Sequence, residues 1–297
     1  MTDRLLGSGL IIVDKPTGMT SHDVISRLRR IFRTRRVGHA GTLDPMATGV
    51  LVVGIERGTR FLAHLVTETK TYRATIRLGA STTTDDAEGN ITSRTDTTDV
   101  TDTLIGAAIA QLTGDIMQKP AAVSAIKIDG KRAHERVRDG ETVDIPARPV
   151  TVHRFDVLDR RSVDGYIDLD VDVFCSSGTY IRSLARDLGN ALGVGGHLTA
   201  LRRTTVGPFD LTHARTLEEL EDNPQLSLTL DQALAASFPI LRVSGEEGHK
   251  LAMGQWLEPR GLKGIHAAVT PDGQAVALVK EKGKRLATVF VARPSTL

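Results

Sequence analysis

One stretch near the N-terminus places the strongest limits on what this chain can form. Residues 36–51 read RVGHAGTLDPMATGVL and combine one carboxylate, Asp44, with three glycines and a proline. Glycine permits backbone angles that are closed to other residues, while Pro45 fixes its own φ and disfavours helical geometry at Asp44. The sequence therefore predicts a stiff, irregular loop here, whether Asp44 only caps a turn or performs chemistry.

The residues that follow this loop predict a buried strand. Residues 50–55 read VLVVGI, and such a short apolar run is typical of a strand in the core. An acidic side chain on a rigid loop beside a core strand is a common arrangement for a catalytic group. Asp44 is therefore the first candidate functional residue.

Composition narrows the class of protein. The 297 residues carry 38 Lys and Arg against 36 Asp and Glu, so any binding to nucleic acid must come from local patches rather than from the net charge. Cys175 is the one cysteine, which excludes an intrachain disulfide and a cysteine metal cluster. We find no secretory signal and no apolar run near the ~18 residues that span a bilayer. These features predict a cytoplasmic protein without a membrane anchor.

Apolar periodicity predicts both helices and strands. Helical spacing covers residues 20–31, 59–66, 102–112 and 180–192, and strand patterns cover residues 10–13, 69–78, 150–158, 166–174 and 198–206. We therefore expect an α+β fold with a mixed, mostly antiparallel central sheet and flanking helices. After Pro239 short strands alternate with turn signals, which predicts a small C-terminal β-barrel. The expected domains are residues 1–236 and 237–297.

Charged clusters give three further predictions. Six arginines fall within residues 27–36 without an acidic residue among them, which indicates phosphate contacts rather than a merely solvated face. Acidic residues in the loop 81–90 lack the spacing of a calcium loop, so we predict no metal site. Asp168, Asp170 and Asp172 alternate along one expected strand and predict a water-exposed sheet face.

Five motifs together resemble one family, the TruB-type tRNA pseudouridine synthases. The resemblance covers roughly residues 9–215, and the motifs agree with the family in order and spacing. They are residues 14–18 (DKPTG), 38–45 with 47–49 (GHAGTLDP and ATG), 70–73 (KTYR), 177–182 (SGTYIR) and 201–203 (LRR).

The resemblance implies a fold and a reaction. It implies a pseudouridine synthase-like catalytic domain and, for residues 237–297, a PUA-like RNA-binding domain. The enzyme would isomerise uridine 55 in the T loop of tRNA to pseudouridine without a cofactor or a metal. It would bind the tRNA T stem-loop as a monomer and would need no guide RNA.

The resemblance also assigns roles to individual residues. Asp44 matches the family's nucleophile position, Arg182 the arginine that pairs with it, and Tyr72 the tyrosine that stacks on the base. Tyr180 and Leu201 match residues that line the uracil pocket. The remaining expected substrate contacts are His39, Asp86 and Lys15, of which Lys15 matches a lysine that supports the catalytic loop. The expected contacts to the RNA backbone are Arg29, Arg30, Arg33, Arg36, Lys127, Lys131, Arg202 and Arg203.

The chain departs from the family pattern at two places. Where the family has Pro-Pro-x-Tyr-Ser-Ala, Ala121 replaces the second proline and Val123 the tyrosine, and a later Leu-Tyr-Glu pattern reads Ala133-His134-Glu135. Both places lie outside the proposed chemistry, so they concern local packing and RNA contact.

Three other functions stay open at this point. A non-catalytic RNA-binding protein on the same fold would not need Asp44, Tyr72 and Arg182 together. A glycosidase-like hydrolase would need a second carboxylate as general acid, for which Asp85 or Asp86 is available. The same isomerisation on another RNA, directed by a guide, would require protein partners.

Overall fold

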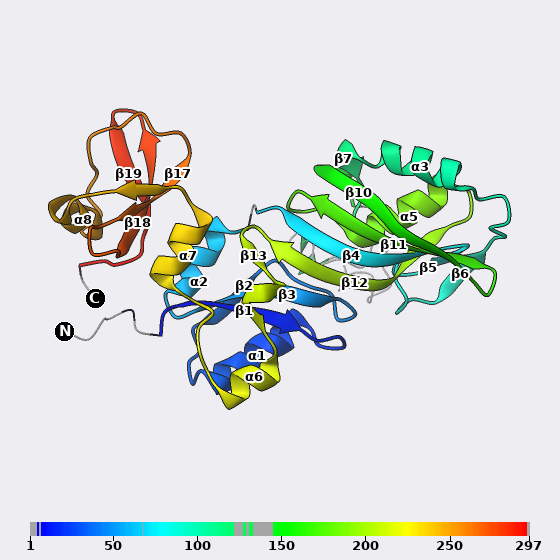
Figure 1. Ribbon diagram of the computed structural model, residues 1–297, viewed down its shortest axis with the longest axis horizontal. Coiled ribbons are helices and arrows are strands. Elements are labelled where there is room, and N and C mark those ends of the chain that lie inside the picture. Colours follow the sequence, from blue (N-terminus) through cyan, green and yellow to red (C-terminus); the bar gives the residue numbers. More distant parts are fainter. Residues whose placement is uncertain are drawn as a thin grey trace. The chain divides into compact units, whose positions relative to one another are not determined.

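The computed structural model describes residues 5, 7–66, 68–121, 127–128, 131–132 and 145–295 (Figure 1). The chain divides into two compact units. Unit 1 joins Met1–Val66 to Thr205–Leu297, and unit 2 is the intervening Thr67–Thr204. The two ends of the chain therefore build one unit, and its middle builds the other.

Two long antiparallel strands form the centre of unit 1. β1 (Gly9–Lys15) pairs with β3 (Thr48–Ile55) over its whole length, from Gly9 opposite Ile55 to Lys15 opposite Gly49. β2 (Val37–Ala40) adds to β3. Distant segments complete β1, since β14 (Ala214–Arg215) pairs with it in parallel and β15 (Leu228–Thr229) antiparallel. The predicted core strand after the Asp44 loop is confirmed, because residues 49–55 of β3 are buried.

The helices of unit 1 begin at sequence caps. α1 (Ser21–Ile31) starts with a capping box between Thr20 and Asp23 and buries Val24, Ile25 and Leu28. α6 (Leu217–Asp222) starts with a capping box at Thr216 and lies beside α1 (Figure 1). The remaining helical segments up to residue 237 are α2 (Gly58–Phe61), the 3₁₀ turns Leu62–His64 and Leu211–His213, and α7 (Leu230–Ser237).

The C-terminal segment, residues 237–297, contains a four-stranded sheet and one helix. The strand order is β16 (Ile240–Arg242), β17 (Ile265–Val269), β18 (Ala275–Lys282) and β19 (Arg285–Val291). α8 (Gly245–Ala252) packs on this sheet through Leu251, which shares a core with Ala277 and Leu286. Since β16 and β19 are the two ends of the sheet among the described strands, a closed barrel is not confirmed.

The C-terminal segment shares a hydrophobic core with the N-terminal strands. Leu10 of β1 and Val52 of β3 belong to the same buried cluster as Leu278 and Phe290. Polar contacts support this packing: the Arg57 guanidinium donates to the carbonyl oxygens of residues 291 and 292, and Arg293 pairs with Asp231 of α7. A domain boundary at residues 236–237 stays a prediction.

Unit 2 is built on a second set of strands, in the order β12 (Gly196–Val206), β4 (Lys70–Leu78), β11 (Tyr166–Cys175), β10 (Arg148–Val163) and β7 (Gly114–Gln118). The pairs β4–β11, β11–β10 and β10–β7 are antiparallel. α3 (Asp102–Gln111) and α5 (Ile181–Ala191) pack against each other beside this sheet (Figure 1).

Short strands complete the described chain. β5 (Ala80–Thr82) pairs with β6 (Ile91–Arg94), and β8 (Lys127–Ile128) pairs with β9 (Lys131–Arg132). The last two residues of β12 belong to unit 1, where they pair with β13 (Phe209–Asp210).

The prediction of a water-exposed face on β11 is wrong for Asp168. Asp168 is buried and accepts two hydrogen bonds from the Arg77 guanidinium, at 2.7 and 2.8 Å. Asp170 lies opposite Thr75 on β4 and accepts its hydroxyl hydrogen bond at 2.7 Å. The reason is cross-strand pairing: the neighbouring strand presents basic and hydroxyl side chains to the aspartates.

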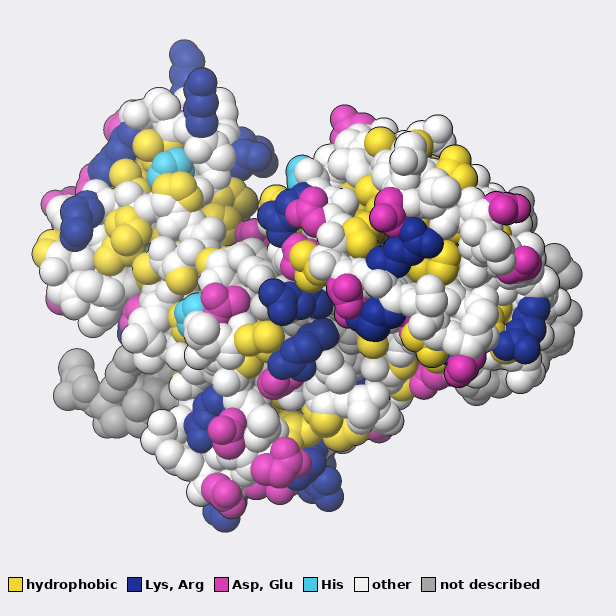
Figure 2. Space-filling view, turned by 45° about the vertical axis from the view of Figure 1, so that its right-hand side comes forward, with side chains coloured by type: hydrophobic (Ala, Val, Ile, Leu, Met, Phe, Trp, Pro, Cys, Tyr) yellow, Lys and Arg dark blue, Asp and Glu magenta, His cyan; other side chains and the backbone are white. Residues whose placement is uncertain are grey.

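The predicted fold class is confirmed at the level of a mixed α+β protein with mostly antiparallel strands. Basic and acidic side chains are interspersed on the face drawn in Figure 2, in keeping with the near-zero net charge. Within the described ranges, no helix has the length and apolar character needed to cross a membrane.

Candidate active site

The loop that carries Asp44 connects β2 to β3 in unit 1, and hydrogen bonds hold its main chain. Ser21, at the start of α1, accepts from the Leu43 amide at 2.9 Å and donates to the Leu43 carbonyl at 3.1 Å. The Gly18 amide donates to the Pro45 carbonyl at 2.8 Å. The predicted stiff, irregular loop is therefore confirmed, and the half-buried carboxylate sits on a fixed backbone.

Lys15 supports this loop from inside the protein. Its side chain is fully buried, and its ammonium group donates to the carbonyl oxygens of Pro16 at 2.9 Å, Met19 at 2.6 Å and Pro45 at 3.3 Å. A lysine enclosed in this way does not reach a bound RNA. Its place among the substrate contacts is therefore corrected to a support of the Asp44 loop.

Arg182 lies in the first turn of α5 in unit 2, and Tyr180, the residue just before this helix, is held by two hydrogen bonds. The Gln118 side chain donates to the Tyr180 carbonyl at 3.1 Å and accepts from the Tyr180 amide at 2.8 Å. The Arg182 guanidinium is buried, donates to the Thr84 carbonyl at 3.1 Å and lies 3.4 Å from an Asp86 carboxylate oxygen. The structure thus brings together two predicted site residues, Arg182 and Asp86.

Asp86 is held on the loop between β5 and β6. It is 2% exposed and accepts hydrogen bonds from the Thr84 hydroxyl and, at 3.1 Å, from the Glu88 amide. Buried carboxylates are stabilised by such hydrogen bonds and by a nearby cation. Asp86 therefore acts as an anchor for Arg182 in this unit.

The neighbouring pair Asp85–Arg186 was missed as a supporting element at the sequence level. Asp85 has a left-handed φ of 60°, and its carboxylate lies 3.1 Å from Arg186, one helical turn after Arg182. Arg186 also donates to the Lys119 carbonyl at 2.7 Å. Burial raises the pKa of Asp85, while Arg186 acts in the opposite direction. The four-residue spacing of the two arginines on α5 was the available signal.

Tyr72 and Leu201 lie on neighbouring strands of unit 2, β4 and β12, and both are largely buried. Lys70, in the same motif as Tyr72, is also buried and donates to the Glu68 carbonyl at 2.8 Å. Burial, together with the nearby charge of Arg203, lowers the pKa of Lys70 to about 8.

The arginines expected at the RNA backbone occupy different environments. Arg29, Arg30, Arg33 and Arg36 are exposed on or after α1, and Arg36 lies 3.4 Å from Glu56. Arg202 is half-buried, whereas Arg203 is only 1% exposed. A phosphate contact through Arg203 therefore does not fit the structure, because β12 turns its guanidinium inward.

Other predicted positions are described only in part. His39 is half-buried on β2. Lys127 and Lys131 belong to β8 and β9, but their side chains lie outside the described residues. The departure at Ala121 falls on a buried position, whereas Val123 and His134 lie outside the described residues.

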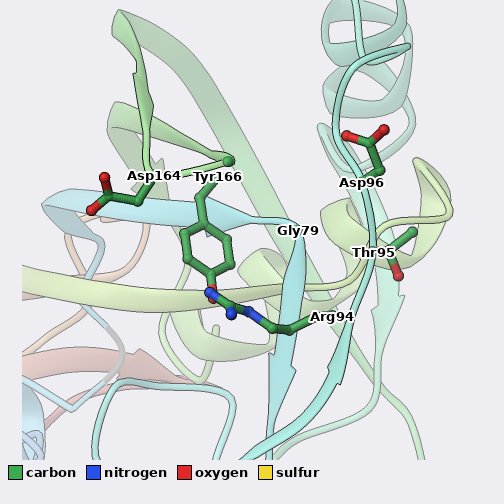
Figure 3. Close-up of a pocket in the computed structure, with 7 residues that line it drawn as sticks. Gly79, Arg94, Thr95, Asp96, Asp164 and Tyr166 are labelled. Atoms are coloured by element: carbon green, nitrogen blue, oxygen red, sulfur yellow. The ribbon is translucent and has the colours of Figure 1, made fainter.

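A separate pocket of about 260 Å³ in unit 2 contains none of the predicted site residues (Figure 3). It is lined by the backbone bends at Gly79 and Gly165 and by Arg94, Thr95, Asp96, Asp164 and Tyr166. The Tyr166 ring has the Arg94 guanidinium at 4.7 Å and the Arg77 guanidinium at 5.1 Å from its centroid. The pocket therefore lies at the end of the β10–β11 hairpin, where arginine side chains pack against the Tyr166 ring.

Comparison with known proteins places these features in a family. Residues 29–181 match the model described as TruB family pseudouridylate synthase (N terminal domain). Residues 182–236 match the tRNA pseudouridylate synthase B C-terminal domain, and residues 238–293 match tRNA pseudouridine synthase II, C terminal.

Curated relatives and solved structures agree with these matches. The chain is 72% identical to tRNA pseudouridine synthase B of Corynebacterium efficiens over all of both chains. It is 60% identical to the protein of that name from Nocardia farcinica, over 97% of this chain and 94% of the relative. A Cbf5-Nop10-Gar1 complex contains a chain with a TM-score of 0.74 and 27% identity, covering 98% of this chain and 87% of that one. The chain therefore belongs to the TruB family of pseudouridine synthases, which are isomerases.

Proposed function

We propose that this protein isomerises uridine 55 in the T loop of tRNA to pseudouridine, with Asp44 as the essential carboxylate. The observation that carries the proposal is the rigidly held Asp44 loop in a chain of this family. The curated relatives named tRNA pseudouridine synthase B support tRNA as the substrate.

The reaction rearranges the nucleotide without net loss or gain of atoms. The bond between N1 and C1′ breaks, the uracil rotates, and C5 bonds to C1′; the proton leaves C5 and N1 is protonated. An ionised carboxylate near C1′ can attack the sugar, stabilise an oxocarbenium-like species or remove the 2′ proton. Asp44 serves in one of these three roles.

The other proposed residues prepare the base and the carboxylate. Tyr72 stacks on the uracil and is a candidate for removing the C5 proton, although a phenol is a weak base near neutral pH. An opposite charge keeps a partly buried carboxylate ionised, and the family resemblance assigns that charge to Arg182. Asp86 fixes the Arg182 guanidinium in its own unit. Tyr180 and Leu201 line the uracil pocket.

The substrate must change shape to enter the site. A base inside a folded T loop is out of reach, so the target uridine flips out. Specificity comes largely from the shape of the T loop, as is usual for folded RNA. The exposed arginines on and after α1, of which Arg30 and Arg33 are examples, contact phosphates.

We also propose the broader setting of the activity. Residues 1–236 form the catalytic domain, and residues 237–297 form a PUA-like RNA-binding domain; the separate family match to residues 238–293 supports this division. The enzyme acts in the cytoplasm as a monomer and without a guide RNA. Its reaction uses neither a cofactor nor a metal.

The test is release of tritium from C5-labelled uridine in a T-arm stem-loop, with no added cofactor. Stoichiometric release is expected, and it should disappear when the target uridine is replaced by cytidine. Tight binding of the stem-loop without release would instead favour a non-catalytic RNA-binding protein. Release of free uracil would favour a hydrolase.

Replacement of Asp44 tests its role within the same assay. Asp44→Ala should abolish tritium release while the dissociation constant for the stem-loop stays near that of the wild type. Asp222→Ala, at an exposed acid on α6, serves as the control and should keep full activity. Turnover by Asp44→Ala close to that of the control would remove Asp44 from the reaction.

A further inference from the structure

The only tryptophan of the chain lies at the surface of the C-terminal segment. Trp256 follows α8 and is 45% exposed, although tryptophan side chains are on average highly buried. It lines a pocket of about 470 Å³ together with residues of α8 and the chain after it, including Lys250, Gln255, Glu258 and Arg260. An exposed indole in a pocket is a candidate contact for a planar ligand.

Two contacts hold this part of the surface in place. The Arg285 guanidinium from β19 lies over the indole, 4.8 Å from the ring centroid, in a cation–π arrangement. The main chain of the adjacent Leu257 exchanges hydrogen bonds of 3.0 and 2.8 Å with Leu286. Since nearly half of the indole stays exposed beside Arg285, the ring is both ordered and open to a ligand.

Some of the charged side chains around the pocket form ion pairs, and others do not. Glu247 pairs with Arg260, and Lys250 lies 2.8 Å from Glu246. Among the described residues, neither Arg285 nor Glu258 has an ion-pair partner. The pocket therefore offers the carboxylate of Glu258 to a ligand, while Arg285 lies outside the lining and holds the indole through the cation–π contact.

The net charge of the surrounding segment favours an RNA ligand over a basic or neutral one. Residues 237–297 contain nine Lys and Arg against five Asp and Glu, whereas the rest of the chain contains 29 against 31. The positive excess of the protein thus lies in this segment, and Lys and Arg side chains project from it at the upper left of Figure 2. Such an excess attracts a phosphate backbone.

We propose that Trp256, held by Arg285, forms a stacking site for an unpaired nucleobase of the RNA, at a nucleotide outside the T arm that carries the modified uridine. Base stacking on an aromatic ring beside arginine is a general way to bind single-stranded RNA. Glu258 and the Gln255 amide oxygen accept hydrogen bonds, so the site favours bases with an exocyclic amino group over uracil. This inference rests on the proposed function only in taking RNA as the substrate.

Trp256 provides its own probe, because its fluorescence reports on this site alone. We expect hexamers of adenylate to quench the fluorescence saturably and more tightly than hexamers of uridylate, and a full-length tRNA transcript to quench it as well. Emission that stays unchanged at tRNA concentrations where a gel shift shows binding would overturn the proposal.

Variants test the site through binding. Trp256→Ala should weaken binding of full-length tRNA about tenfold, within the range expected for one stacked base, and Trp256→Phe should recover most of it. Val289→Ala is the matched control, since Val289 is 42% exposed on the same segment and does not line the pocket. Thermal unfolding checks that all three variants fold. Equal tRNA affinity of Trp256→Ala and Val289→Ala would refute the stacking site.

Activity separates this proposal from the proposed function. Trp256→Ala should raise KM for full-length tRNA with kcat unchanged, and should leave both constants unchanged for an isolated T-arm stem-loop. A wild-type protein that fails to turn over either substrate would contradict the proposed function, while the fluorescence titration would still decide the stacking site. Equal losses on both substrates would contradict a separate site.

Discussion

The buried ammonium group of Lys15 links the first strand to the loop that carries Asp44. Three carbonyl oxygens surround it, and one belongs to Pro45. Without the ammonium these carbonyls lose a charged donor inside the protein, and such a loss typically costs a few kcal/mol.

Lys15→Met should therefore lower the free energy of unfolding by about 2–4 kcal/mol and also reduce kcat, because the Asp44 loop loses a support. Urea denaturation and tritium release measure the two effects. Lys250→Met is the control, since the Lys250 side chain is 44% exposed and forms a surface pair with Glu246; it should change stability by less than about 1 kcal/mol. Equal stability of the two variants would show that the ammonium is dispensable.

The other buried lysine, Lys70, makes stability depend on pH. Its pKa falls from the ordinary 10.5 to about 8, chiefly through burial and then through Arg203, against opposing effects of Cys175 and Glu68. Below pH 8 both the folded and the unfolded chain hold this proton. Between pH 8 and 10.5 the unfolded chain holds it more strongly, so the contribution of Lys70 to stability rises with pH.

The comparison with Lys70→Met isolates this effect, because Cys175 and Glu68 are present in both proteins. The free energy of unfolding of the wild type minus that of the variant should increase by about 2 kcal/mol between pH 8 and pH 10. Chemical denaturation across this range measures it. Parallel stability curves would mean that Lys70 keeps an ordinary pKa in the folded protein.

The sequence predicted the conformation around a residue where a local motif determines it. It did not predict whether a side chain is buried, because burial depends on segments far away in the chain. The Asp-Pro step and its glycines predicted the loop of Asp44 from local backbone chemistry. The enclosure of Lys15 and Arg203 depends on which segments later cover them. From the motif alone, a basic side chain could therefore be expected either to contact RNA or to support the protein from inside.

At the scale of elements, the neighbouring strands β4, β11 and β10 contain charged pairs in two environments. Asp168 is buried against Arg77, whereas Asp156 on the outer strand β10 is exposed beside Arg154. Removal of one partner from a buried pair leaves an uncompensated charge, while an exposed pair contributes little.

Asp168→Asn should lower the free energy of unfolding by about 3 kcal/mol, and Asp156→Asn by less than about 1 kcal/mol. Both substitutions keep the side-chain volume, so the comparison isolates burial of the charge. Guanidinium denaturation of the two variants under the same conditions measures it. Similar losses would mean that Arg77 finds solvent when its partner is removed.

Elements were predictable to the extent that their own residues determine them. The apolar stripe and cap of α1 and the alternation of β4 and β11 are local, and the structure contains all three elements. The face of β11 was misjudged because Thr75 and Arg77 belong to another segment, about 90 positions earlier along the chain. The tertiary fold decides which strands pair, and the residues of one strand alone do not determine its partner.

At the scale of the whole molecule, Asp231 of α7 ties the C-terminal segment to the earlier part of unit 1. Its carboxylate pairs with Arg293 and accepts from the Ala275 amide at 2.8 Å. Asp231→Ala should lower the free energy of unfolding by about 2–3 kcal/mol while the transition stays cooperative, because the shared core persists. Calorimetry of this variant beside Asp222→Ala, at an exposed acid, measures the loss; a transition split in two would show that the core alone does not couple these parts.

Unit 1 is made from both ends of the chain, and this arrangement orders events during synthesis. β1 and the Asp44 loop leave the ribosome early, yet β1 needs β14 and β15, which lie beyond residue 213. Unit 2 is continuous in sequence and is complete before those strands exist. Since domains tend to fold as they emerge, the nascent chain completes its middle first, and the surroundings of the Asp44 loop are assembled only when the later part of the chain has been translated.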